Sequence, residues 1–363
     1  MSRCAYFFGF SIVAILAASF VGSAQAVTIS TVPVGDPGNA ADSTTGFGAV
    51  NYVYQIGKYD VTASQYAAFL NAVAATDTYD LYNSFMASDF PTVGISRSGS
   101  SGSYSYSVIG NGNVPIFDVT WGSSARFANW LHNGQPTGPE GPGTTETGAY
   151  TLNGATSTAA LMAVTRNAGS LWFIPTEDEW YKSAYYKGGG LNAGYWLFPT
   201  QNNSTPSNVL SATGTNNANF YNPPRFTDPT NYLTSVGAFA ASPGPYGTFD
   251  QGGDLFQWNE TAVTGSSRGV RGGSYNGTAL GLRSSYGLDD VPTDEFFDLG
   301  FRVASVPEPS SVILLFIGIV ALAIARRRVP RRSALRARAA RIVAPASGRS
   351  SRESLAPAVH GAR

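Results

Sequence analysis

The sequence contains very few of the side chains that bind transition metals or act as nucleophiles. Its 363 residues include one cysteine, Cys4, and two histidines, His132 and His360. These counts exclude a disulfide framework, a zinc–thiolate site and a cysteine nucleophile beyond the first few residues. They also exclude a three-histidine iron site within one chain. Ser-His-Asp catalysis would depend on His132, and no nucleophile motif accompanies that residue.

Charged residues are scarce and unevenly placed. Only 13% of the residues are charged, and the 23 basic and 23 acidic side chains cancel. Residues 326–363, however, contain 11 arginines and a single acid, Glu353. The 41 glycines, 21 prolines and 19 tyrosines indicate loops and turns rather than a helical bundle, while a hydrophobic content of 43% is sufficient for a core.

The beginning of the sequence is typical of a secretory signal peptide. Residues 1–26 combine Arg3 with a long apolar run and end in Ala-Gln-Ala, the small residues that signal peptidase accommodates. Cleavage after Ala26 would remove Cys4 and leave a mature chain that begins at Val27 and has no cysteine. The sequence therefore predicts an exported protein.

A second signal lies near the other end. Residues 306–310 read Val-Pro-Glu-Pro-Ser, and an apolar run at 312–325 and three arginines at 326–328 follow. This order resembles the PEP-CTERM sorting signal, which implies an exosortase-type enzyme as a partner and anchoring at the membrane or cell surface. The apolar run would span about 21 Å, less than the roughly 30 Å hydrocarbon core of a bilayer. The basic tail at 329–363 lies behind this stop-transfer signal, so no nucleic-acid partner is predicted despite its charge.

Three helix starts are predicted between the two signals. Thr62 and Thr176 each begin a capping box, and Gly188 is expected to close the second helix. Apolar spacing predicts a third helix at 122–132.

Strand signals are short, and much of the chain is irregular. β patterns occur at 53–58, 171–174, 269–275 and 300–305. The segments 96–113 and 135–159 are interpreted as surface insertions, and 200–253 is so rich in Asn, Pro, Gly, Ser and Thr that regular hydrogen-bond ladders cannot order it. We expect one α+β domain at 50–304, preceded by a lead-in at 27–49.

Six short motifs, which follow one another in a fixed order, indicate which kind of domain this is. They are YQIGKYDVT at 54–62, VPIFDVTW at 114–121, IPTEDEW at 174–180, YGTFDQGG at 246–253, RGGSY at 271–275 and GFRVA at 300–304. Together they resemble the formylglycine-generating enzyme, or sulfatase-modifying factor, domain over roughly 50–304. The resemblance implies a loop-rich variant of the C-type-lectin fold with few helices and short antiparallel strands.

Several residues of these motifs also have a purely structural interpretation. Four tryptophans are expected in the core rather than at a ligand site: Trp121, Trp130, Trp180 and Trp258. Arg271 and Arg302 are expected to pair with carboxylates, with Glu177 or Glu179 as candidate partners. Such residues indicate the fold and not, by themselves, a reaction.

The resemblance also implies structural calcium, which needs only oxygen ligands. The first predicted site takes side-chain oxygens from Asn219 and Asp228 and backbone oxygens from Phe220 and Thr230. The second falls on Asp250, Gly253, Leu255 and Gln257, where neutral Gln257 replaces the glutamate that is usual in the family. The alternative is that these residues form Asx-turns without a metal.

The active enzymes of the family hold copper with two cysteines that follow the Gly-Gly-Ser-Tyr stretch. Here residues 276–283 read Asn-Gly-Thr-Ala-Leu-Gly-Leu-Arg and contain no thiol. Because copper(I) requires soft sulfur ligands, neither copper nor iron is expected as a cofactor. The absence also argues against formylglycine chemistry.

The leading interpretation is an exported, surface-anchored scaffold or binding protein without catalytic activity. The aromatic-rich segments 96–113 and 181–196 are candidate contact surfaces for extracellular polysaccharide. The alternative is an oxidoreductase or other enzyme of the same superfamily whose chemistry does not use cysteine.

Overall fold

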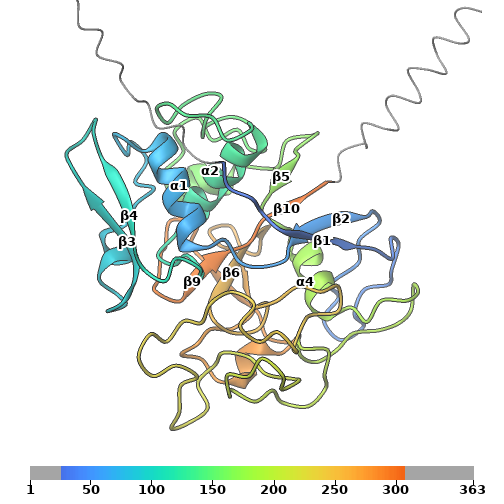
Figure 1. Cartoon of the computed structure of the whole chain (residues 1–363). Helices are drawn as coiled ribbons and strands as arrows, with labels where there is room; N and C mark the ends of the chain where they lie inside the picture. The colour runs from blue at the N-terminus through green and yellow to red at the C-terminus, as the bar shows by residue number, and fades with distance from the viewer. Residues whose placement is uncertain (1–25, 307–363) are drawn as a thin grey trace, which may run out of the picture. The chain divides into compact units, whose positions relative to one another are not determined.

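The computed structural model describes residues 26–306, in which short helices and strands are separated by long loops (Figure 1). The elements in chain order are β1 (Thr31–Val34), β2 (Tyr54–Gly57), α1 (Ala63–Val73), η1 (Ser84–Ala87), β3 (Val93–Ser98), β4 (Ser105–Gly110), α2 (Trp121–His132), α3 (Thr158–Met162), β5 (Trp172–Phe173), α4 (Glu177–Tyr185), β6 (Phe256–Ala262), β7 (Arg268–Arg271), η2 (Ala279–Leu282), β8 (Leu288–Asp290), β9 (Leu299–Phe301) and β10 (Ala304–Ser305). The predicted α+β class is confirmed.

The strands form two four-stranded sheets and a hairpin. The first sheet has the order β1-β2-β10-β5 with antiparallel neighbours, so β10 lies between β2 and β5. The second has the order β8-β7-β6-β9, in which β6 and β9 run parallel. β1 belongs to the segment 27–49, which the sequence indicated only as a lead-in; this segment is therefore part of the fold.

Local capping explains where the helices begin. Thr62 caps α1 and Thr176 caps α4, and both form the complete capping box with the residue three positions on, as predicted. Thr120 caps α2 through the backbone N–H of Ser123. The expected end of α4 at Gly188 is wrong, because the helix ends at Tyr185 and Tyr186 turns into extended backbone.

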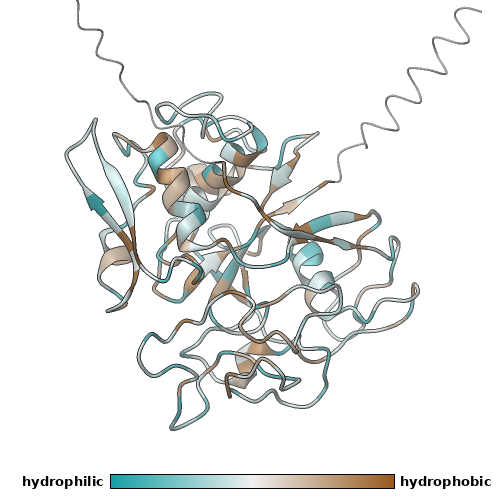
Figure 2. Cartoon of the chain, in the orientation of Figure 1, coloured by the Kyte–Doolittle hydropathy of each residue, from teal (hydrophilic) through white to brown (hydrophobic). Residues whose placement is uncertain are grey.

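The core is largely aromatic. The four tryptophans predicted to be buried are at most 2% exposed. Between α1 and α2, the rings of Tyr66, Phe69, Phe127 and Trp130 pack with centroids 5.3–6.0 Å apart, distances at which aromatic pairs attract. Brown, hydrophobic stretches mark these helices in Figure 2, whereas the loops of 200–250 are mostly pale or teal.

The chain between α4 and β6 has no helix or strand, as its composition predicted. Isolated bridges such as Asn219 with Gly253 and Ser207 with Asn217 hold it instead, together with many bonds from side chains to the backbone. Burial of polar groups in this loop-rich half is tolerated because most of them find partners.

Two segments differ from the sequence prediction. Residues 96–113 are not an irregular insertion, since most of them lie in the hairpin of β3 and β4. Residues 135–159 are not confined to the surface either. They carry Tyr150, which is fully buried, and Glu146, which forms a buried ion pair with Arg126 at 2.6 Å. The charged Glu146 side chain can be buried because it is paired with Arg126.

The predicted ion pairs are partly confirmed. Arg271 binds Glu177 at 2.6 Å, as expected. Glu179 instead binds Arg166, and Arg302 binds Asp60 at 2.8 Å. His132, at the end of α2, accepts a hydrogen bond from the backbone N–H of Leu171.

The predicted targeting segments lie mainly outside the described residues. These are residues 1–25 of the signal peptide, the apolar run 312–325 and the tail 329–363. Within residues 26–306, no helix combines the length and the apolar character needed to cross a membrane. The backbone N–H and carbonyl of Val27, the predicted first residue of the mature chain, both pair with the side-chain amide of Gln135.

Candidate functional site

The side chain of Asn219, in the first predicted calcium site, is held in place by the hydrogen bonds that its amide nitrogen donates. Its side chain is 1% exposed, and Nδ2 donates to the carbonyl of Tyr232 and to Asp254 at 2.7–2.8 Å. The other amide atom, Oδ1, is buried without a hydrogen-bond partner among the described residues. A buried oxygen without a partner usually indicates an ordered water or an ion. The Asn219 oxygen thus fits a cation ligand.

Asp228 of the same site forms an Asx-turn. Its Oδ1 accepts the backbone N–H groups of Thr230 and Asn231, and Oδ2 accepts the amide of Asn231. Partial burial opposes ionisation, but these bonds outweigh it and hold the pKa of Asp228 below its usual range. The carboxylate is therefore ionised and fixed in direction. The backbone of Tyr232 links Asp228 to Asn219. The N–H of Tyr232 donates to the backbone carbonyl of Asp228, and the carbonyl of Tyr232 accepts a hydrogen bond from the side-chain amide of Asn219.

The two backbone ligands predicted for this site have different surroundings. The carbonyl of Phe220 already accepts the Asn208 amide at 3.2 Å, and its ring packs in a small apolar cluster with Phe198 and Leu282. Thr230 is exposed. The four residues come from one loop but are not drawn into one polar cluster by hydrogen bonds. The first calcium site stays a prediction, and Asn219 and Asp228 fit it best.

Gln257 does not fit the ligand role predicted for it in the second site. Its Oε1 accepts the indole N–H of Trp180 at 2.7 Å and the Nε–H of Arg302 at 2.6 Å. Its Nε2 donates to the carbonyl of Asp250. A cation at this oxygen would displace both donors and face a buried guanidinium group.

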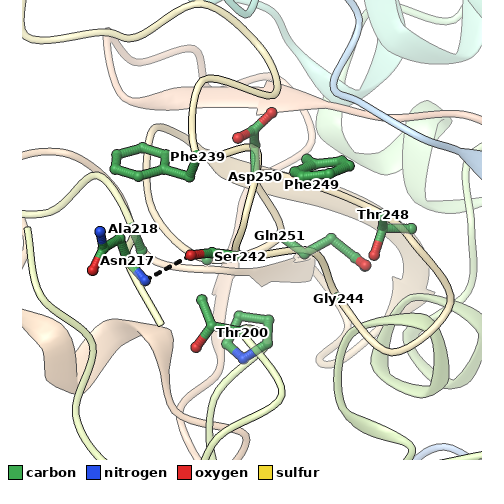
Figure 3. Close-up of a pocket in the computed structure, with 12 residues that line it drawn as sticks. Thr200, Asn217, Ala218, Phe239, Ser242, Gly244, Thr248, Phe249, Asp250 and Gln251 are labelled. Carbon is green, nitrogen blue, oxygen red and sulfur yellow. Dashed lines mark hydrogen bonds between the residues drawn. The ribbon is translucent and has the colours of Figure 1, made fainter. Parts of the chain in front are cut away.

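Of the remaining residues of the second site, only Asp250 lines a small cavity (Figure 3). Asp250 accepts the backbone N–H of Gly237, and Gly253 pairs with Asn219 through the backbone, while Leu255 is fully buried. Burial and the nearby Asp254 and Asp60 carboxylates raise the pKa of Asp250 well above its usual value.

Two more buried oxygens that have no hydrogen-bond partner in the described part of the chain line that cavity. They are Thr248 Oγ1 and Gln251 Oε1, and the Gln251 side chain extends toward Thr248 in Figure 3. The volume of about 10 Å³ is sufficient for roughly one water molecule. Within residues 26–306, no group of three or more His, Cys, Asp or Glu side chains is placed to hold a metal ion.

The segment that follows Tyr275 is packed only at its end, since Gly281 and Leu282 are buried whereas Leu280 is 56% exposed. Residues 279–282 form η2, and Leu282 is fully buried against Phe198 and Phe220. Gly273 lies so close to η2 that a Cβ there would come within 2.8 Å of Leu282 Cδ1. The hydroxyl of Tyr185 also binds the carbonyl of Leu282. An apolar side chain, that of Leu282, therefore anchors the stretch in which the resembled enzymes carry cysteines.

An acidic cluster that the sequence did not reveal surrounds Asp118. Asp118 is 2% exposed, has a φ of 56°, and its Oδ2 lacks a hydrogen-bond partner in the described chain. Burial, followed by the charges of Asp89 and Glu295, raises its pKa to about 8. Asp298 contributes as well. The only sequence signal was an aspartate inside an otherwise apolar run, VPIFDVTW.

Only part of the aromatic segment 181–196 can contact a ligand. Tyr181, Tyr185 and Tyr186 are fully buried, and the first two pack in a core cluster with Trp180. Tyr195 and Trp196 instead line a cleft of about 270 Å³ beside Asp42. The candidate contact surface is thus reduced to the end of the segment.

Two family models match the chain. The Sulfatase-modifying factor enzyme 1-like domain matches residues 44–306, and the PEP-CTERM protein-sorting motif matches residues 305–330. None of the curated proteins matches it. The sorting motif supports export, recognition by an exosortase system and anchoring at the membrane or cell surface.

Three solved structures are similar at low identity. CarF is 19% identical with a TM-score of 0.47, covering 77% of this chain and 99% of its own. Variable protein 1 of Treponema denticola is 16% identical with a TM-score of 0.42 and coverages of 78% and 98%. PvdO from Pseudomonas aeruginosa is 18% identical with a TM-score of 0.40 and coverages of 77% and 92%. The family model is the stronger result, because it spans every helix and every strand except β1. On that basis the chain belongs to the family of the sulfatase-modifying factor enzyme 1-like domain.

Proposed function

We propose that this protein is a non-catalytic binding domain displayed at the cell surface. The observation that carries the proposal is the segment 276–283, which has no thiol and packs through Leu282 into an apolar cluster. The only cysteine of the chain, Cys4, belongs to the predicted signal peptide. Carboxylates favour hard cations, so they cannot replace sulfur in holding copper(I). The thiol-dependent reaction of the resembled enzymes thus has no ligand set in this domain.

The purified full-length protein is expected not to convert a cysteine to formylglycine. The assay incubates it with copper and a peptide that carries the sulfatase cysteine motif, and follows by mass spectrometry the exchange of the thiol for an aldehyde. An active family enzyme is the positive control, and copper alone is the negative one. Turnover above the copper-only sample would overturn the non-catalytic function.

A second candidate function is catalysis by carboxylates. The observation that favours it is Asp118, whose raised pKa and unpartnered oxygen are properties that general acids share. A hydrolase screen that compares wild type with Asp118→Asn would separate the two functions. Activity that the substitution abolishes would support an enzyme.

We also propose that calcium occupies the first predicted site in the exported protein. The buried, unpartnered oxygen of Asn219 and the ionised Asp228 support this, because calcium takes amide, carboxylate and backbone oxygens in flexible geometry. Asp250, Gly253 and Leu255 remain candidates for a second ion without Gln257. Polysaccharide is the proposed ligand class of the domain.

Calcium removal is expected to lower the melting temperature. A site of about 10 μM affinity in about 1 mM calcium would stabilise the fold by about 2.7 kcal/mol. Melting with calcium and with EDTA measures this increment in wild type and in Asp228→Asn. Asparagine keeps an oxygen for the Asx-turn but removes the charge, so the increment from calcium should disappear in the variant. The melting curves of wild type and variant in EDTA should stay close to each other. Equal melting temperatures of wild type in both buffers would argue against the site.

A further inference from the structure

A polar cleft lies on the half of the domain that contains α2 and the β3–β4 hairpin. Its volume is about 430 Å³, within the range of roughly 300–1,000 Å³ that small-molecule sites occupy. Residues 276–283 do not line it, and it shares no lining residue with the cavity beside Asp250. We call it the arginine cleft and define it by Tyr79, Asp80, Arg97, Arg126, Thr156 and Glu295.

Arg126 supplies a buried hydrogen-bond donor to the cleft. Its side chain is 2% exposed, and Nε and Nη2 bind the two oxygens of Glu146 at 2.6 and 3.1 Å. Nη2 also donates to the carbonyl of Ala155. The third nitrogen, Nη1, makes no hydrogen bond to another described residue and lies next to Gly122, which also lines the cleft. Because a bidentate carboxylate fixes one edge of this guanidinium group, the other edge can donate hydrogen bonds to a ligand without any further ordering of the side chain.

Arg97 lies on another wall and is held in a similar way. Its Nη1 binds Asp77 at 2.8 Å, and its guanidinium carbon lies 4.7 Å from the ring centre of Tyr82 and 4.4 Å from that of Tyr104. These cation–π contacts restrict the side chain although it is partly exposed. Nε and Nη2 form no hydrogen bond within the described chain. Side chains ordered in advance lose little entropy when a ligand binds.

Side chains that accept hydrogen bonds lie in the same cleft. Asp80 and Glu295 line it, and neither forms an ion pair with another residue of 26–306. Burial raises the pKa of Glu295 to about 7, so near neutral pH this side chain both accepts and donates hydrogen bonds.

The charge of the cleft decides which chemistry fits. Each arginine is already neutralised by its own carboxylate, Asp77 or Glu146, and Asp80, together with the ionised fraction of Glu295, adds negative charge. No positive charge remains for a phosphate, a sulfate or a sugar acid. The free N–H groups of Arg126 also oppose a cation. Hydroxyl groups both donate and accept, so a ligand rich in neutral hydroxyls satisfies both sets of side chains.

We propose that the arginine cleft binds a neutral saccharide of one or a few units. Arg126 and Arg97 donate to its hydroxyls, and Asp80 and Glu295 accept from them. The inference rests on the proposed binding function and assigns it a place and a ligand class. It also places Arg97, from the hairpin strand β3, at the contact surface expected in 96–113.

The test titrates the full-length protein with defined tetrasaccharides and follows binding by calorimetry. The neutral set is cellotetraose, laminaritetraose, maltotetraose and mannotetraose. Oligoguluronate is the anionic comparison and deacetylated chitotetraose the cationic one. At least one neutral compound is expected to bind at least tenfold more tightly than both charged ones.

Three variants locate the site. Thr156→Trp fills the cleft from an exposed position and is expected to weaken binding at least tenfold without loss of folding. Asp80→Asn should weaken it several-fold, and asparagine tolerates the φ of 52° at this position. Asp289→Asn is the matched control on exposed β8 and should leave binding unchanged.

Each outcome has a separate meaning. Neutral-sugar binding that survives Thr156→Trp would refute the cleft and leave the proposed binding function standing. A preference for the anionic or cationic compound would refute the neutral ligand class. If no saccharide binds wild type, both the cleft and saccharide binding as the function of the domain are wrong.

Discussion

Replacement of Arg302 by methionine is expected to lower the free energy of unfolding by about 3–5 kcal/mol, the cost typical of breaking a buried ion pair. Arg302 is 0% exposed. Its guanidinium binds Asp60, Gln257 and the carbonyls of Gly57 and Phe249 at 2.6–2.9 Å. Methionine has a similar length but satisfies none of these groups, so Asp60 would remain buried without its partner. Urea unfolding followed by tryptophan fluorescence measures the change.

Arg225→Met is the matched control for this variant, because Arg225 is an exposed residue in the loop between α4 and β6. It should shift the urea midpoint very little. A loss for Arg302→Met that does not exceed that of the control would mean that the network around Arg302 is not needed for stability.

The Asp118→Asn variant is expected to be more stable than wild type at pH 8, and the difference should be much smaller at pH 5. The folded-state pKa of Asp118 is about 8, against about 4 in an unfolded chain. The folded protein therefore retains a proton that the unfolded chain has lost between these values, and stability falls as pH rises from about 4 to about 8. The size of this effect is on the order of several kcal/mol. Asparagine stays neutral at every pH, so this loss of stability should be absent from the variant.

The measurement is the melting temperature between pH 5 and pH 9. Asparagine also accepts the φ of 56° at position 118, so the backbone should not be strained. Asp289→Asn again serves as the exposed comparison and should keep the slope of wild type. A wild-type protein whose stability rises from pH 5 to pH 8, or a variant with an unchanged slope, would contradict the placement of Asp118 among like charges.

The sequence predicts best what is decided locally. Thr62 and Thr176 begin helices because each capping box is completed within four residues. The tryptophans lie in the core because they stand beside apolar runs. The hairpin of β3 and β4 was missed although Tyr104-Ser-Tyr-Ser alternates with the period of a strand, since its serines and glycines favoured a loop interpretation.

What the sequence could not predict depends on distant partners. The environment of Gln257 is decided by Trp180, 77 residues away, and by Arg302, 45 residues away. The same is true of Asp118, whose neighbours are Asp89 from the loop before β3 and Glu295 and Asp298 from the loop before β9. The parallel pairing of β6 with β9 is likewise non-local. Motif order indicates the family, but such contacts decide what each residue does.

The position of β10 determines how the domain would respond to mechanical load. The sorting motif begins at Ser305, the last residue of β10, so a pull from a surface anchor would reach the domain first through β10. That strand is not an edge, because Ala304 pairs with Ile56 on one side and with Phe173 on the other. Two antiparallel ladders would have to yield together, and Arg302 fastens the chain just before them to β2 and β6. Drag on the displayed domain would therefore be borne by the middle of the sheet.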